Sequence, residues 1–223
     1  MQSRTPMRAD RFTLAPCLFF AAALLLPSLA NAQMESRGSH VAGHITALVP
    51  EDTVSREQHT LPAAKDMDLL WQDVVKTGSA GRVRIELADG SALSLSSDAQ
   101  LQILRHDPRR QQTILQLLYG RLLASAMHIG RSSGKFEVST PTAVVGVVGT
   151  RFGVKVDPES TDVLCRDGEV RVRNVDKSVL GEVVVRAGEF THVERGKPPS
   201  PPAAASLERI RAGEDATAIP NTP

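Results

Sequence analysis

Apolar and polar side chains alternate in short runs through the middle of the chain, with turn residues between the runs. In residues 82–96, Val83, Ile85 and Leu87 alternate with charged side chains up to an Asp89-Gly90 pair, and alternation resumes after it. A period of two predicts strands with one buried face and one solvated face, and Asp-Gly is a frequent hairpin turn. The pattern therefore predicts an all-β domain.

The same alternation predicts further strands on both sides of this hairpin. Residues 41–49 form the first expected strand, and residues 163–173 repeat the pattern around Asp167-Gly168, which predicts a second hairpin. A last strand pair is expected at residues 182–186 and 189–193. A strand, a glycine turn and another strand recur about every twenty residues, which suggests a twisted, solenoid-like or sandwich-like stack of short strands.

Two segments are less regular. Residues 113–127 are rich in Leu and Ala, which favour helices, yet the central Gly120 and the flanking Asp107-Pro108 turn favour two strands, which we expect here. Residues 65–76 fit one or two helical turns, and they fit an extended segment leading to a tight turn equally well.

Glycines interrupt a β-branched apolar run in residues 140–154. Valine favours a half-buried pleated surface, and glycine allows positive φ or close backbone approach. The run therefore predicts strand, tight bend and strand, with Gly146 and Gly149 as the residues that permit the bend.

The N-terminal segment has the pattern of a secretory signal peptide. Three arginines precede an apolar run at residues 12–29, and Ala30-Asn31-Ala32 supplies small residues for cleavage after Ala32. Pro16 and Pro27 argue against a retained membrane anchor.

These patterns predict the organisation of the whole chain. We expect a signal peptide in residues 1–32, a flexible N-terminus in 33–39, a β domain in 40–195 and a Pro-rich disordered tail in 196–223. Within the tail, residues 207–211 could form one short helical turn.

Charge and cysteine content narrow the function classes. The chain has 26 basic and 25 acidic residues, and loss of the signal peptide leaves 23 and 24. A near-neutral protein gives no electrostatic case for nucleic acid. Cleavage also removes Cys17, so the mature chain has no internal disulfide, and the alternation of residues 163–173 predicts that Cys165 is buried.

The chain shows no pattern that would carry catalysis or hold a cofactor. Gly146 and Gly149 are followed by a strand instead of the helix that a phosphate loop needs. His40 and His44 are the only histidines close in sequence, and no further metal ligand has motif spacing. We expect no enzyme activity, no cofactor and no metal.

The glycine motif and its surroundings resemble the core signature of FecR-type periplasmic domains. The motif residues are Thr140, Pro141, Gly146, Gly149, Thr150, Arg151, Phe152 and Gly168. The family commonly has a basic residue between the two glycines, where this chain has Val148.

The resemblance implies a twisted, solenoid-like β domain in an envelope protein. FecR regulators relay occupancy of an outer-membrane iron-siderophore receptor to a cytoplasmic sigma factor. Because no cytoplasmic region precedes the apolar run, we do not expect sigma-factor control. We expect a secreted, non-catalytic binding, sensing or adaptor module of the periplasm.

The expected partner is an outer-membrane receptor or an inner-membrane signalling protein. We expect the contact face at the end coils and the strands beside residues 146–152. The alternative is a carbohydrate- or cell-wall-binding module, for which Trp71 and Tyr119 are the candidate aromatics.

Overall fold

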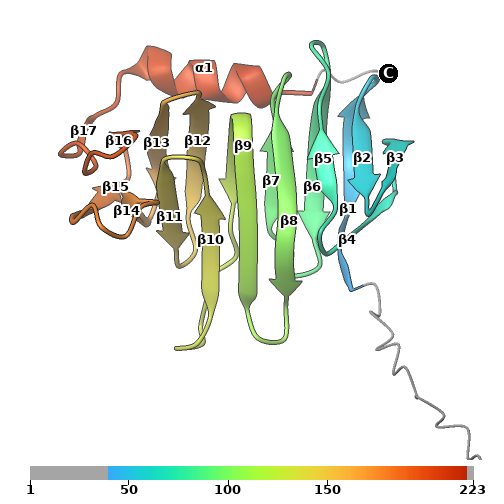
Figure 1. Cartoon of the computed structure of the whole chain (residues 1–223), viewed down its shortest axis with the longest axis horizontal. Coiled ribbons are helices and arrows are strands. Elements are labelled where there is room, and N and C mark those ends of the chain that lie inside the picture. Colours follow the sequence, from blue (N-terminus) through green and yellow to red (C-terminus); the bar gives the residue numbers. More distant parts are fainter. Residues whose placement is uncertain (1–39, 220–223) are drawn as a thin grey trace, which may run out of the picture. The chain divides into compact units, whose positions relative to one another are not determined.

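Two β-sheets, here called sheet A and sheet B, make up most of the computed structural model, which describes residues 40–219 (Figure 1). The expected signal peptide and flexible N-terminus lie outside the described residues. In spatial order, sheet A consists of β4 (Asp68–Leu70), β1 (Val41–Val49), β6 (Arg82–Leu87), β7 (Ala92–Leu95), β9 (Gln112–Ser125), β12 (Arg151–Asp157), β13 (Ser160–Asp167), β16 (Glu189–Glu194) and β17 (Ala203–Ala204). Sheet B consists of β3 (His59–Pro62), β2 (Thr53–Arg56), β5 (Val74–Lys76), β8 (Gln100–Asp107), β9, β10 (Lys135–Ser139), β11 (Ala143–Val147), β14 (Glu169–Asn174) and β15 (Glu182–Arg186).

Strand β9 belongs to both sheets. Its first half pairs with β8 and β10 in sheet B, and its second half pairs with β7 and β12 in sheet A. The change falls at Gly120, which has φ 88°, and a Cβ there would lie 2.4 Å from the Cβ of Ala99. The extended conformation predicted around Gly120 is observed, but as one continuous strand and not as two, with its two halves paired in different sheets.

The chain crosses between the sheets at corners, and a residue with positive φ occupies most of them. The eight such residues are Glu51, Asp66, Gln72, Asp98, Gly120, Gly149, Gly168 and Gly188. Glycine accepts this backbone conformation without the Cβ penalty that other residues pay.

These corners correct one prediction and confirm another. The Asp89-Gly90 hairpin joins β6 to β7 as expected. Asp167-Gly168 is not a hairpin, because β13 pairs with β12 and β16 while β14 pairs with β11 and β15. An Asp-Gly pair supplies the same left-handed residue to either connection, so the local sequence does not tell a hairpin from a corner.

The core lies between the two sheets and follows the alternation seen in the sequence. In β6, Val83, Ile85 and Leu87 are buried while Arg84 and Glu86 are exposed. One continuous cluster of Val, Leu, Ile, Ala and Phe side chains from both sheets fills the space between them. The structure thus confirms the all-β class.

Residues 65–76, where two interpretations were open, form β4 and β5 with a corner at Gln72 between them. The extended interpretation is the one observed. No helix within residues 40–219 has the length and apolarity to span a membrane.

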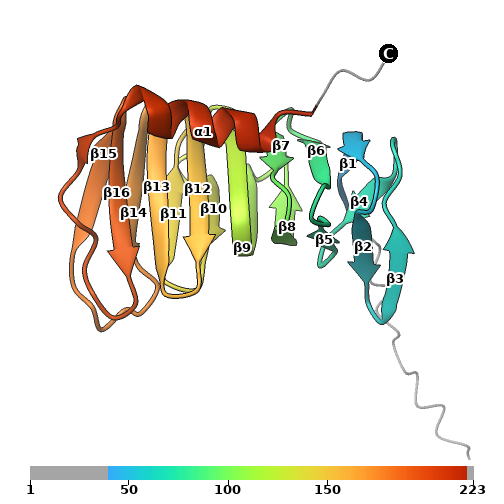
Figure 2. The same cartoon turned by 90° about the horizontal axis from the view of Figure 1, so that it is seen from above.

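The C-terminal segment differs from its prediction as a disordered tail. Residues 203–204 pair with β16, and helix α1 (Leu207–Thr217) lies across sheet A (Figure 2). The side chain of Ser206 caps α1 by accepting a hydrogen bond from the Arg209 amide at 3.2 Å. A helix this short is unstable alone, but an existing sheet face can supply the missing contacts.

Candidate functional site

The glycine motif turns the chain from sheet B into sheet A between β11 and β12. Gly149, with φ 135°, makes the turn, and a Cβ there would lie 2.7 Å from the Cα of His128. Gly146 has no positive φ, and a Cβ there would meet no atom within 4 Å. The expectation of a special backbone therefore holds for Gly149 and is wrong for Gly146.

Three motif residues are buried and serve the fold. Phe152 is fully buried and meets Phe136 edge to face, with ring centroids 6.2 Å apart. Thr150 donates to the Glu169 carbonyl at 3.0 Å. At the other end of β11, the Thr140 hydroxyl accepts a hydrogen bond from the Ala143 amide at 2.8 Å.

The remaining motif residues have separate places. Pro141 lies half-buried between β10 and β11. Gly168 has φ 81° and approaches the first corner, since a Cβ there would lie 3.2 Å from the Gly149 carbonyl oxygen. Arg151 is exposed, and its guanidinium lies 4.0 Å from the Asp167 carboxylate.

A loop that the sequence analysis did not single out lines the same corner. The Ala126 amide donates to the Thr150 carbonyl at 3.0 Å, and the Ile129 amide donates to the Val148 carbonyl at 2.8 Å. These bonds hold Met127 and His128 beside Gly149. Met127 lies two residues after the end of β9 and continues the alternation of that strand on the solvated side, and an apolar side chain at that position is the signal that could have identified it.

We call Met127, His128, Val148, Gly149 and Arg151 the motif corner. Met127 and Val148 are 54% and 52% exposed and are two of the eight exposed large apolar side chains within residues 40–219. Apart from Val148, the residues of the corner border a shallow groove of about 320 Å³ together with Asp167. The corner thus combines apolar surface, a cation and a fixed backbone.

Within residues 40–219, the titratable groups whose pKa values are shifted do not gather into a catalytic arrangement. Burial raises the pKa of Asp52, whose carboxylate accepts a hydrogen bond from the Gly78 amide at 3.1 Å. Burial raises the pKa of Cys165 to about 11, and its thiol points at the Gly168 carbonyl at 3.4 Å. The prediction that Cys165 is buried is confirmed, and a thiol that stays protonated at neutral pH is a poor nucleophile.

The structure gives little support for a metal site or for a carbohydrate-binding platform. Within residues 40–219 no group of three or more His, Cys, Asp or Glu side chains could hold a metal ion. Trp71 stacks on His40 and donates to the His106 carbonyl at 2.7 Å, at one end of β8. Tyr119 lies opposite Gln100 at the other end of β8, about 20 Å away at 3.3 Å per residue, so the two aromatics form no common platform.

His106 gives a pH-dependent prediction. It is 1% exposed, its Nδ1 lies 2.9 Å from the Thr113 hydroxyl, and burial lowers its pKa, against the opposing charges of Asp89 and Asp107. Between this lowered pKa and the unfolded value near 6.5, the unfolded chain binds more protons, so stability falls as the pH falls through that window. We expect the urea midpoint to drop from about pH 7 to pH 5, and to drop less in His106→Gln.

The titration of Asp52 does not affect the comparison between the parent protein and His106→Gln. The raised pKa of Asp52 makes the folded chain bind more protons just above pH 3.8, so its effect on stability has the opposite sign and is shared by both proteins. Equal pH profiles in the two proteins would contradict the assignment to His106.

The model of the FecR protein family matches residues 73–171, from the end of the β4–β5 corner into β14. This chain contains a FecR domain. The FecR match includes the motif corner, while β1 to β4, β15 to β17 and α1 lie outside it.

Solved structures show the same fold. A proposed anti-sigma factor from Parabacteroides distasonis ATCC 8503, in crystal structures at 1.65 and 2.50 Å, is 17% identical with a TM-score of 0.52 in each. The similarity covers 62% of this chain and 63% or 62% of those chains, so the chain spans less than two thirds of their length. At this identity the likeness concerns the fold alone. No curated protein matches the chain.

Proposed function

We propose that this protein is a non-catalytic binding module of the bacterial periplasm, related to envelope signalling, whose motif corner contacts a protein of the cell envelope. The signal peptide expected in residues 1–32 would deliver it there, with cleavage after Ala32. An outer-membrane receptor and an inner-membrane signalling protein are the two partner classes.

The observation that carries the proposal is the surface of the motif corner. Two apolar side chains, Met127 and Val148, are each more than half exposed, and Met127 borders the same groove as the exposed Arg151. Methionine, arginine and other large side chains are enriched where proteins meet. The corner is held by backbone hydrogen bonds and by a glycine with little freedom to move, so little order would be lost on binding.

The comparisons support a regulatory role over a catalytic one. The corner belongs to the FecR domain, and the similar fold occurs in a proposed anti-sigma factor. Proteins of both kinds act through protein partners, which agrees with an exposed apolar corner better than with a substrate cleft.

Site-specific photo-crosslinking tests this proposal. A photoreactive amino acid replaces Val148 or Met127 in the full-length protein in its native host, and Thr60, exposed on the edge strand β3, is the matched control position. We expect one discrete envelope protein to be captured from Val148 and Met127 and none from Thr60, and captured chains to begin at Gln33 in mass spectrometry.

Two results would overturn the proposal. Capture from Thr60 as strong as from Val148 would show that the motif corner is not a specific surface. Capture of glycan without protein would show that the corner binds the cell wall and not a protein.

A further inference from the structure

The outer face of sheet A carries an apolar row that crosses four strands. Leu123, Gly153, Leu164 and Phe190 lie opposite one another on β9, β12, β13 and β16, and all are half-buried. Next to this row lies a charged row made of Arg121, Lys155, Asp162 and His192 in the same order. An apolar row with a charged margin, running across the strands, is the footprint of an amphipathic helix.

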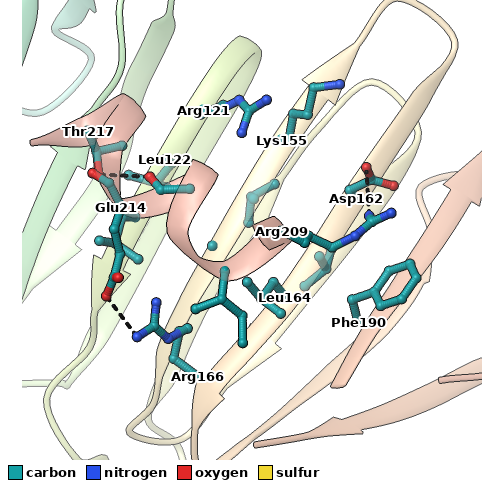
Figure 3. A pocket seen from close by; sticks show the side chains of 16 residues that line it. Arg121, Leu122, Lys155, Asp162, Leu164, Arg166, Phe190, Arg209, Glu214 and Thr217 are labelled. Carbon is teal, nitrogen blue, oxygen red and sulfur yellow. Dashed lines mark hydrogen bonds and ion pairs between the residues drawn. The ribbon is translucent and has the colours of Figure 1, made fainter. Parts of the chain in front are cut away.

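Helix α1 occupies this footprint but fills it poorly (Figure 3). Its residues toward the sheet include Ile210, Gly213 and Thr217, and only Thr217 is buried. Leu207, the other large apolar residue of the helix, is 72% exposed. A cavity of about 70 Å³ remains between helix and sheet.

Two glycines face this cavity, one from each side. A Cβ on Gly213 would meet no atom within 4 Å, and a Cβ on Gly153 would meet only the Leu122 carbonyl oxygen at 3.9 Å. The space would therefore accept larger side chains from a helix than α1 supplies. Unfilled space at an interface forfeits dispersion contacts.

Polar contacts at its margins hold α1 in place. Glu214 pairs with Arg166 at 2.7 Å, Arg209 pairs with Asp162 at 3.4 Å, and the Arg209 guanidinium lies 3.9 Å from the Phe190 ring centroid. These side chains are all partly exposed, and exposed pairs stabilise little. The helix is thus held by exposed ion pairs and by a hydrogen bond from the Arg82 guanidinium to the Ala216 carbonyl at 3.0 Å, over a groove that suits a bulkier helix.

The sheet side of the groove offers more positive charge than α1 uses. Arg121, Lys155 and Arg166 border it, and of these α1 forms an ion pair with Arg166 alone within residues 40–219. Lys155 pairs with Asp157 of its own strand, and no ion pair involves Arg121 within that same range. Charge complementarity therefore favours an occupant with more acidic side chains than α1 has.

We propose that this row is a docking groove for an acidic amphipathic helix of a partner protein, and that α1 is the intramolecular helix this partner displaces. The groove recognises apolar side chains at three- and four-residue spacing and carboxylates facing Arg121 and Lys155. The groove shares no lining residue with the groove at the motif corner, so it is a second surface.

A synthetic peptide serves as the probe. It contains residues 206–219 with Gly213→Leu and Thr217→Leu, is held helical by a staple, and is compared with the same peptide in which lysine replaces Glu208, Glu214 and Asp215. Binding to the mature full-length protein is measured by fluorescence anisotropy, and release of α1 by hydrogen exchange of its amides.

Variants of the protein change how strongly α1 competes with the peptide for the groove. Glu214→Arg places a second cation beside Arg166, so we expect the acidic peptide to bind about fivefold tighter, because the groove is open more often. Gly213→Ala raises helix propensity without a clash, so we expect binding about fivefold weaker. Asp215→Arg makes the same charge change at an exposed residue for which no ion pair to the sheet is found within residues 40–219, and we expect a change of less than about twofold.

Several outcomes would overturn the proposal. Equal affinity in the Glu214→Arg and Gly213→Ala proteins would show that α1 does not compete with the peptide. If the lysine peptide bound as tightly as the acidic peptide, the groove would not recognise carboxylates. If the acidic peptide still bound the Leu164→Arg protein, its apolar side chains would not lie on the groove floor. Dimerisation of Glu214→Arg would show that a second copy of α1 is the occupant. None of these results bears on crosslinking at Val148, so the two proposals fail separately.

Discussion

Gly149→Ala will destabilise the domain by about 3 kcal/mol, whereas Gly146→Ala in the same motif will change its stability by less than about 0.5 kcal/mol. At Gly149 the backbone has φ 135° and a Cβ would lie 2.7 Å from the Cα of His128, a backbone atom that cannot move away cheaply. At Gly146 the added methyl meets no atom within 4 Å. Thermal unfolding followed by circular dichroism should show Gly149→Ala about 6–12 °C below the parent protein.

The pair of variants contains its own control, because the glycines lie three residues apart in one motif and the chemical change is the same. A loss of stability in Gly146→Ala equal to that in Gly149→Ala would show that the motif needs glycine for a reason other than backbone geometry. A stable Gly149→Ala protein would contradict the corner as described.

Phe152→Ala will cost about 3–5 kcal/mol, the range for removing a buried aromatic side chain from a core. Phe152 is fully buried and meets Phe136 across the space between the sheets, so removing its side chain leaves a cavity between sheet A and sheet B. Urea denaturation should show a lower midpoint with an unchanged slope.

Val148→Ala is the matched comparison for the same motif. Its side chain is 52% exposed, so we expect a stability change within about 0.5 kcal/mol and a clear loss of partner capture. If Phe152→Ala kept its stability, or if Val148→Ala lost as much, the division of the motif into a buried and a binding part would be wrong.

The sequence was most informative where one face of a strand is buried. Val83, Ile85 and Leu87 predicted β6, and Val170 and Val172 predicted β14, because burying one face of a sheet requires alternation. Alternation does not identify the strand with which each strand pairs. The hairpin expected at Asp167-Gly168 is a corner, since pairing depends on distant strands that a local turn does not identify.

The candidate site was predicted in part. The motif residues identified the corner, with Arg151 exposed and Phe152 buried, but Met127 joins it through a loop more than twenty residues earlier in the chain. The sequence indicated only one short helical turn at residues 207–211, because the composition of this segment is too polar to form a core, whereas the helix α1 extends to Thr217. Its stability comes from a sheet face that exists only after folding, although Ser206 before Leu207 was a capping signal.

The double membership of β9 has a consequence for how the domain opens. Elsewhere each strand pairs only with its neighbours, so the two ends of the stack can loosen while the rest stays folded, as in repeat proteins. β9 is hydrogen-bonded into sheet B through its first half and into sheet A through its second. Opening β9 therefore breaks strand pairing in both sheets at once. A destabilising change near the centre of the chain affects the whole domain, whereas a destabilising change at either end unfolds only that end.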